Sequence, residues 1–475
     1  MVEAMANAVE DKLIDGLSFR MNPGASYVVD RRSVTYHPQG SNIYQPQQGT
    51  KLIRILLTGD NWLDPTTLRV AFTINNASST ALQELRLLSG PWAFFRRMRI
   101  LAAGQLVEDI DQYNRIHEMM SMFVAKESRI NDAAEEFGNW WDPHQWVTGE
   151  QVASNYDGID ANSSLVVLFK PLSGLLNQSK MLPLRFCPIT IELELVDSYD
   201  EPVLTIPTYT GTRPKLALQS VSAAEEFTTV NCSRSWFINN VQAKCDVCTL
   251  DNALDNSYAQ HLLGGRSLPI SYNTFVSQLQ TIAGQDAPLI NVSRALTRLK
   301  SVFVTLIKDT SSLELSNSRY QLLGRKAWND FFSPMSPDNA TRDTVKHING
   351  GEFEFYVQIG SKMFPEFPIR SHNEAYYQLK KTLGVQSSAV HNFNISAQDY
   401  RDNKFVLGTD CEKVLDAGFT GLNTRAGDLM TISFKYADKG VVDTNVFSRL
   451  ADRIHIILHS DQILEIRDSG CQVFD

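Results

Sequence analysis

Short enzymatic signatures are missing from this sequence of 475 residues. It has no Walker-type phosphate loop, no G-x-G-x-x-G and no G-x-S-x-G, the motifs of nucleotide-binding proteins and α/β-hydrolases. His117 and Glu118 begin a zinc-protease motif, but Ser121 stands where the second histidine is required, so a plain surface helix is predicted there. We therefore expect a protein that is not an enzyme and that uses no cofactor or metal.

Cysteines are few, and long apolar runs are absent. Six cysteines without framework spacing favour a reduced compartment. Cys245 and Cys248 form a C-x-x-C, and Cys232 could join them, but a fourth zinc ligand is missing, so we predict buried free thiols. No window holds 18 consecutive apolar residues, so no transmembrane segment is expected. The acidic first residues lack the positive charge of a secretory signal, which predicts assembly inside the cell.

Basic residues are also in deficit. The formal net charge is −9, which argues against a general nucleic-acid-binding protein because such a protein needs a basic face. Arg96, Arg97 and Arg99 could suggest a local nucleic-acid contact. Their place on a predicted strand favours pairing with acids on a neighbouring strand instead.

Strand patterns fill most of the chain. Apolar residues alternate with polar ones, or run continuously, at Leu52–Leu57, Leu68–Ile74, Phe94–Leu101, Leu165–Phe169, Ile189–Leu195, Trp236–Val247, Leu299–Ile307, Phe353–Ile359, Met430–Tyr436, Ile454–Ile457 and Ile463–Ile466. Few helices interrupt them. One is expected after Asp109 or Asp111, one from Asp251 to Gly264, and one from Ser371 to Leu383. Strands without regular intervening helices predict an all-β protein of the sandwich type.

The length requires more than one domain, because single cores stop growing at about 250–300 residues. Prolines and a glycine at 198–216 indicate a linker. The predicted division is an N-terminal arm at 1–40, a first domain at 41–215 and a second domain at 216–475. Each half has about eight strand candidates, which predicts two tandem eight-stranded β-sandwiches.

Two sets of apolar residues are candidates for contacts between subunits. Met5, Val9, Leu13 and Leu17 recur at helical spacing in the N-terminal arm, and Trp140, Trp141 and Trp146 lie together in a predicted loop. A tryptophan loop can also bind sugars. Glu192 and Glu194 share one strand face and could act as an acid–base pair, although a solvated outer face is favoured.

Two segments resemble a known family. Leu182–Val196 is similar to the closing strands of the first jelly roll in double jelly-roll major capsid proteins, and Ile454–Gly470 is similar to the end of the second. The resemblance is to capsid proteins of polintons, adintoviruses and virophage-like double-stranded DNA viruses. It implies an all-β fold of two tandem eight-stranded jelly rolls with a few short inserted helices.

This resemblance also implies a function. Such proteins form homotrimers in which six jelly rolls approximate sixfold symmetry, and these pseudo-hexameric capsomers tile an icosahedral shell around double-stranded DNA. The implied partners are neighbouring capsomers and the penton and minor capsid proteins, without sequence-specific binding to nucleic acid, and the implied location is the virion capsid. Two alternatives remain open. One is a two-domain carbohydrate-binding or carbohydrate-active protein, and the other is a viral fibre or spike subunit.

Overall fold

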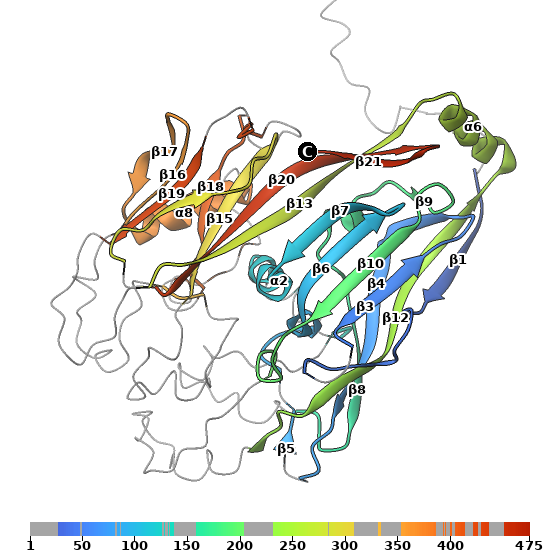
Figure 1. Cartoon of the computed structure of the whole chain (residues 1–475), viewed down its shortest axis with the longest axis horizontal. Coiled ribbons are helices and arrows are strands. Elements are labelled where there is room, and N and C mark those ends of the chain that lie inside the picture. The colour runs from blue at the N-terminus through green and yellow to red at the C-terminus, as the bar shows by residue number, and fades with distance from the viewer. Residues whose placement is uncertain are drawn as a thin grey trace, which may run out of the picture.

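The computed structural model describes most of the chain from Tyr27 to Asp475. Its longest gaps are residues 137–157, 204–230, 308–330, 334–352 and 437–450, and shorter gaps fall within 48–49, 81–86, 126–133, 284, 386–403 and 414–428. The described residues form two β-sandwiches side by side along the long axis of the molecule (Figure 1).

The first sandwich pairs two four-stranded antiparallel sheets. One sheet has the order β1 (Val28–Tyr36), β12 (Trp236–Leu250), β4 (Trp62–Asn76) and β8 (Ser164–Phe169). The other has the order β3 (Leu52–Leu57), β10 (Ile189–Leu195), β6 (Phe95–Ala102) and β7 (Gln105–Asp111). Four two-residue strands add local pairings: β2 (Ile43–Tyr44), β5 (Gln83–Glu84), β9 (Leu182–Pro183) and β11 (Asn231–Cys232).

The second sandwich repeats this plan. One sheet has the order β13 (Leu268–Thr281), β20 (Arg453–Arg467), β15 (Leu299–Ile307) and β18 (Leu407–Asp410), and β21 (Gly470–Phe474) pairs with the end of β20. The other has the order β14 (Leu289–Val292), β19 (Met430–Tyr436), β16 (Phe353–Ile359) and β17 (Lys362–Ile369).

Both sandwiches have jelly-roll topology. Counted along the chain, the first, eighth, third and sixth of the eight main strands form one sheet, and the second, seventh, fourth and fifth form the other. Each sandwich also has a helix between its fifth and sixth strands. This helix is α2 (Tyr113–Met122) in the first sandwich and α8 (His372–Thr382) in the second. The predicted fold class, two tandem eight-stranded jelly rolls with a few inserted helices, is confirmed.

Strand pairing indicates a different boundary between the two domains from the one that the sequence predicts. Trp236–Leu250 had the pattern of a first strand of the second domain, but β12 lies between β1 and β4 in the first sandwich. Strand β1 likewise belongs to this sheet, although it falls within the predicted arm at 1–40. We therefore propose that the first jelly roll extends from Val28 to Leu250, past the predicted linker, and that α6 (Asn252–Leu263) connects the two jelly rolls.

Local patterns explain most of the strand bounds. In β10, Ile189, Ile191, Leu193 and Leu195 are buried, as their two-residue alternation predicts. Strand β15 is buried on both faces, which fits its continuous apolar run. Strand β20 differs from the expectation, because Arg453–Arg467 is one strand of 15 residues and not two short ones. It stays extended because β13 pairs with it along almost its whole length.

Three helices were predicted to begin at a residue whose side chain caps the N-terminus, and two of them do. The Asp251 carboxylate accepts a hydrogen bond from the backbone N–H of Ala253 at the start of α6, and the Ser371 hydroxyl accepts one from Glu374 at the start of α8. The expected capping of α2 by Asp109 or Asp111 is wrong. Its N-cap is Gln112, which has a left-handed backbone (φ 52°) and no side-chain cap, because both aspartates are still part of β7.

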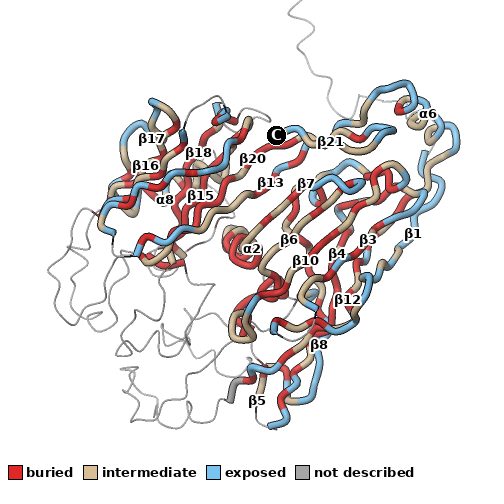
Figure 2. Tube along the Cα trace, viewed as in Figure 1, coloured by how far each residue is buried: buried red, intermediate tan, exposed pale blue. Residues whose placement is uncertain are grey.

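One connected set of buried apolar side chains runs through both sandwiches. The tube in Figure 2 shows buried residues along the facing strands of each sandwich and again at α2, between the two. The junction of the sandwiches is therefore part of the hydrophobic core.

Candidate assembly interface between the jelly rolls

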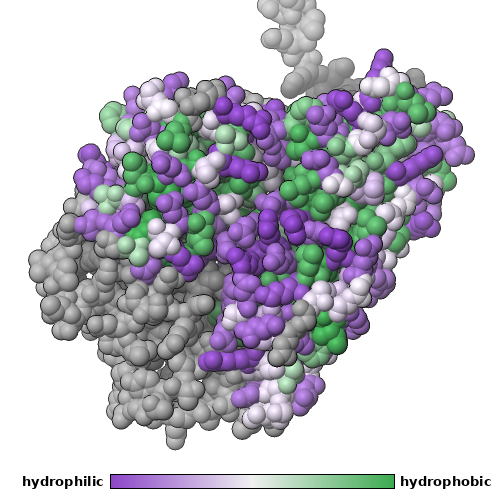
Figure 3. Space-filling view, viewed as in Figure 1, coloured by the Kyte–Doolittle hydropathy of each residue, from purple (hydrophilic) through white to green (hydrophobic). Residues whose placement is uncertain are grey.

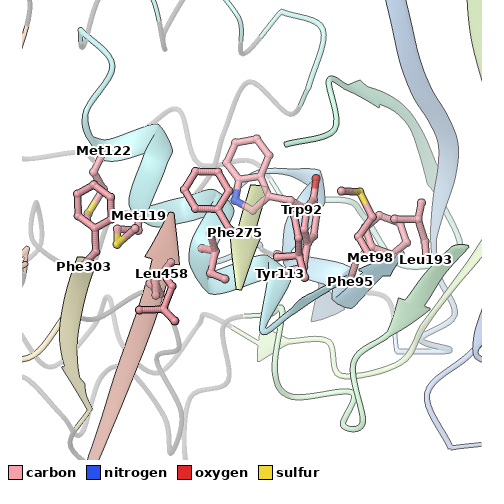
Figure 4. Close-up of a cluster of buried hydrophobic side chains, with 14 of the residues drawn as sticks. Trp92, Phe95, Met98, Tyr113, Met119, Met122, Leu193, Phe275, Phe303 and Leu458 are labelled. Carbon is pink, nitrogen blue, oxygen red and sulfur yellow. The ribbon is translucent and has the colours of Figure 1, made fainter. Parts of the chain in front are cut away.

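Apolar side chains of α2 dock against the outer face of the second sandwich. Met119 and Met122 lie beside Phe303 of β15 (Figure 4). The Phe123 ring lies 6.2 Å from that of Phe303, measured between ring centroids. Methionines suit such a junction because their flexible side chains fill irregular gaps.

Arg115 crosses the junction from α2. Its residue is only 4% exposed, and its guanidinium carbon lies 4.4 Å from the centroid of the Phe331 ring. One guanidinium nitrogen donates to the backbone carbonyl of Leu306 at 3.2 Å and to the Thr305 hydroxyl at 3.4 Å. Arg115 of the first sandwich therefore bonds directly to β15 of the second.

A buried carboxyl lies on the first-sandwich side of the junction. Glu108 of β7 accepts hydrogen bonds from the backbone N–H groups of Gly174 (2.9 Å) and Leu175 (3.4 Å), and from the Ser173 hydroxyl. These donors stand at the start of the short helix α5 (Gly174–Asn177). Burial outweighs them and raises the pKa of Glu108 to about 7.

Strand β13 of the second sandwich passes close to the same place. A Cβ atom built on Gly174 would lie 1.6 Å from the backbone oxygen of Asn273 in β13, so only glycine allows this approach. The Tyr272 hydroxyl lies 3.2 Å from the backbone oxygen of Val107, and the Ser277 hydroxyl donates to the backbone oxygen of Asp111 at 2.8 Å. Strand β7 and strand β13 are therefore joined by side-chain to backbone bonds.

A buried histidine adds to the polar groups of the junction. His455 of β20 is fully buried, and burial together with the nearby cations Arg115 and Arg453 lowers its pKa from 6.5 to about 3. It is neutral near pH 7. The junction thus contains two titrating groups, Glu108 and His455, whose pKa values are shifted in opposite directions.

The predicted carboxylate pair has a different environment from the one expected. Glu192 is only 5% exposed, so its predicted solvated face is wrong. Its two oxygens are engaged by cross-strand arginines, one by Arg54 Nε at 2.7 Å and the other by Arg99 Nη2 at 3.1 Å. Glu194 lies two residues along and is half-buried. The arginines cover Glu192 and leave no open acid–base pair on this sheet.

Arginines of β6 pair with acids, as predicted from their alternation. Arg97 makes two bonds of 2.7 Å to the Asp109 carboxylate, and Arg96 pairs with Asp197. In Figure 3, hydrophilic side chains cover this part of the first sandwich. The surface is a mixed ladder of both charges, without the basic excess that nucleic-acid binding requires.

His117 and Glu118 were expected on a plain surface helix, and this is wrong for Glu118. Its carboxylate is buried and accepts hydrogen bonds from the Ser89 hydroxyl and from Trp92 Nε1 (3.1 Å), while the His117 ring stacks on Trp92. Cys245 and Cys248 are buried free thiols, as predicted. Within the described ranges, no cluster of three or more histidines, cysteines or acids could hold a metal ion.

The predicted contact residues lie outside the described residues. These are Met5, Val9, Leu13, Leu17, Trp140, Trp141 and Trp146. Sequence analysis also did not identify the junction residues Glu108, Arg115, Gly174 and His455. A histidine inside an apolar strand and an arginine inside an apolar helix face were the only local signals. In the described part of the chain, no helix is both long and apolar enough to span a lipid bilayer.

Solved structures share this architecture over nearly the whole chain. A chain of the Sputnik virophage structure is 8% identical with a TM-score of 0.59, and the alignment covers 97% of this chain and 91% of that one. VP54 of PBCV-1, fitted into a Sputnik reconstruction, is 9% identical with a TM-score of 0.56 and coverage of 95% and 98%. The Faustovirus major capsid protein is 9% identical with a TM-score of 0.54 and coverage of 98% and 94%.

Sequence comparison alone finds no such likeness. No protein-family model and no curated protein matches the chain. The similarity is therefore one of structure, and it extends through both sandwiches. This chain has the double jelly-roll fold of viral major capsid proteins.

Proposed function

We propose that this chain is the major capsid protein of a double-stranded DNA virus and that its function is self-assembly into the virion shell. The observation that carries the proposal is the pair of jelly rolls of identical strand order, which resembles solved capsid proteins over 95% or more of this chain. The acidic net charge of −9 fits a shell that encloses DNA without binding it tightly.

The repeated fold supports a particular assembly. Each chain supplies two similar sandwiches, so three chains around a threefold axis supply six. Six similar sandwiches approximate sixfold symmetry, and such a capsomer can tile a nearly hexagonal lattice. We propose a homotrimer of this kind, with neighbouring capsomers and the penton and minor capsid proteins as further partners.

The native mass tests the trimer directly. Light scattering on the purified chain is expected to give a species near three times 53.4 kDa, and negative-stain images of the same peak are expected to show a hexagonal outline. A stable monomer at micromolar concentrations, with no hexagonal particles, would contradict the proposed capsomer.

A further inference from the structure

Each of the two jelly rolls brings one cysteine to the same place at their junction. Cys187 lies between β9 and β10 of the first sandwich and is fully buried, and Cys471 lies on β21 of the second sandwich and is half-buried. Their side chains share a hydrogen bond, which places the two sulfur atoms next to each other. Both thiols are free in this structure. A pair of thiols that meets across two halves of a chain can join them by a disulfide bond.

The backbone around Cys187 is held by hydrogen bonds. A turn closes between β9 and β10, where the N–H groups of Phe186 and Cys187 both donate to the carbonyl of Pro183, at 3.1 and 2.9 Å. The carbonyl of Pro188 accepts a hydrogen bond of 2.8 Å from the N–H of Ala103, directly after β6. The Cys187 side chain therefore keeps a set position within the buried apolar set.

Strand β21 is held in the same way on its own side of the junction. It pairs with β20 from Ile463 to Arg467, and Cys471 stands opposite Ile466. Cys471 is half-buried and its neighbour Gln472 is exposed, so β21 turns its Cys471 face toward the rest of the molecule. In Figure 1 the hairpin of β20 and β21 lies over the first sandwich, where β21 contacts β7.

The residue after β21 anchors the far end of this strand. The Asp475 carboxylate accepts hydrogen bonds from Gln462 Nε2 (2.7 Å) and Arg425 Nη2 (3.1 Å), and its backbone oxygen accepts one from the Thr297 hydroxyl. Pairing with β20 and these side-chain contacts together fix β21 along its length. The Cys471 sulfur is thus presented to Cys187 by a strand that is already in place.

The two thiols differ in acidity, and this difference sets the order in which they react. The hydrogen bond from Cys187 lowers the pKa of Cys471, so Cys471 is the one that forms the reactive thiolate. The hydrogen bond to Cys471, together with burial, raises the pKa of Cys187. Burial likewise raises the pKa of Cys245, to about 12, and the pKa of Cys411. Among the described cysteines, Cys471 therefore combines partial exposure, a lowered pKa and a neighbouring thiol.

We propose that Cys187 and Cys471 are a disulfide-forming pair that joins β21 to the first sandwich when the folded chain meets a disulfide oxidant such as oxidised glutathione. The Cys471 thiolate attacks one sulfur of the oxidant and releases one glutathione thiolate, which takes up a proton. Cys187 then loses its proton to solvent, and its sulfur attacks the Cys471 sulfur and releases the second glutathione. Two cysteine thiols are oxidised to one disulfide bond, and one oxidised glutathione is reduced to two thiols.

This order of steps fits the burial of the two residues. The oxidant needs to reach only Cys471, which is half-buried, because the second step is internal to the chain. When Cys471 is bound to glutathione, it is no longer a thiolate, so the hydrogen bond that raised the pKa of Cys187 is lost. The buried thiol then ionises more easily and can displace the glutathione.

The bond closes a long loop of the chain and opposes separation of the two jelly rolls. It is a property of the folded chain and needs no capsomer, so its test is independent of the proposed function. In the proposed capsid role, the bond forms when the particle passes from the reducing interior of the cell to an oxidising environment.

Mass spectrometry of the oxidised full chain tests the pairing. The reduced chain is incubated with oxidised glutathione under native conditions, blocked with iodoacetamide and digested without reduction. We expect one linked pair of peptides that contains Cys187 and Cys471, and the free thiols counted after denaturation are expected to fall from six to four. In the Cys187→Ser variant, glutathione is expected to stay attached to Cys471, because the thiol that displaces it is gone.

Thermal unfolding measures what the bond does to the fold. The oxidised wild type is expected to unfold roughly 5 °C above the reduced wild type, because the bond restricts the unfolded chain. Cys471→Ser is expected to abolish this shift. The control is Cys411→Ser, which removes another buried thiol of the second sandwich and is expected to keep the shift. Each variant is compared with its own reduced form, so the cost of the substitution itself cancels.

Three outcomes would overturn the proposal. The first is a native chain that stays fully reduced in excess oxidised glutathione, or whose disulfide joins other cysteines. The second is a bond between Cys187 and Cys471 that forms only in urea, since the folded contact would then have no part in it. The third is a native bond that leaves the unfolding temperature unchanged, which would show that it does not join the two sandwiches against unfolding.

Discussion

Glu108 is a buried carboxyl that accepts hydrogen bonds from two backbone N–H groups and from the Ser173 hydroxyl. Its pKa is 4.5 when unperturbed and about 7 in the fold, so between these pH values the folded chain holds a proton that the unfolded chain has lost. Its contribution to stability is therefore full below pH 4.5 and is lost as the pH rises through 7. His455 has the opposite effect. Its pKa is 6.5 when unperturbed and about 3 in the fold, so below pH 6.5 the unfolded chain binds a proton that the folded chain does not. The folded chain therefore loses stability as the pH falls below 6.5.

Glu108→Gln isolates the first of these effects. Glutamine keeps the shape of the protonated carboxyl but does not titrate, so the free energy of unfolding of the wild type relative to the variant is expected to rise by roughly 3 kcal/mol between pH 7.5 and pH 4.5. Urea denaturation at several pH values measures this difference, and the His455 effect cancels because both proteins contain it. A difference that stays constant with pH would show that Glu108 is ionised in the fold.

Gly174→Ala tests the close approach of α5 to β13. The added methyl group would overlap the backbone oxygen of Asn273, so α5 and β13 must move apart, at a cost of about 1–3 kcal/mol in the free energy of unfolding. Gly104→Ala is the control. It lies in an open turn at φ 82° and has only the cost of a left-handed backbone, about 1 kcal/mol. Equal losses in urea denaturation would mean that the junction relaxes freely around Gly174.

Burial of single charged residues could not be read from the sequence. Glu192 shows the same alternation as a solvent-facing strand residue, and Glu118 the same spacing as a surface helix residue. Glu192 is covered by Arg54 and Arg99, and Glu118 is covered by Trp92. These covering residues come from other segments of the chain. Local periodicity gives the face of a residue but not what covers that face.

At the scale of elements, strands with clear alternation or a continuous apolar run were predictable, whereas six of the main strands and the pairing of all strands were not. The six main strands without a prediction are β1, β7, β13, β14, β17 and β18. The alternation in β10, β16 and β19 gave their bounds within a residue. The proline-rich linker at 198–216 looked like a domain boundary, yet β12 returns to pair with β1, more than 200 residues away in the chain. Composition marks a loop, and only strand order shows which sandwich the next strand joins.

The N-terminal arm is an element whose role stays a prediction. Its apolar residues Met5, Val9, Leu13 and Leu17 recur at helical spacing, which favours contacts between subunits over a place in either core. Deletion of residues 1–22 is therefore expected to leave a folded trimer but to lower the yield of assembled particles. Light scattering of the trimer and particle counts by electron microscopy measure the two effects. A wild-type particle yield would reject this role.

At the scale of the whole molecule, the two jelly rolls share one core and should not be separable. The outer face of β15 is covered by α2, with Phe303 against Met119 and Met122 (Figure 4). The second half alone, residues 252–475, is therefore expected to expose this face and to aggregate or bind a hydrophobic dye.

Expression of residues 252–475 beside the full chain measures this coupling. Size-exclusion chromatography and dye fluorescence report exposed apolar surface, and calorimetry of the full chain is expected to show both jelly rolls unfolding in one transition. A soluble, monodisperse second half with the full chain's stability would show that the junction is only a surface contact.

The position of β12 between β1 and β4 also sets the order of events during synthesis. The first sheet cannot close until Leu250 has left the ribosome, since β12 is the strand that joins its two halves. At about 5–20 residues per second, the edge of β1 waits roughly 11–43 seconds and the facing edge of β4 roughly 9–35 seconds until Leu250 has been added. Nascent chains on one polysome carry the same open edges side by side, so translation speed and chaperone supply, as well as final stability, govern how much of this protein reaches the native state.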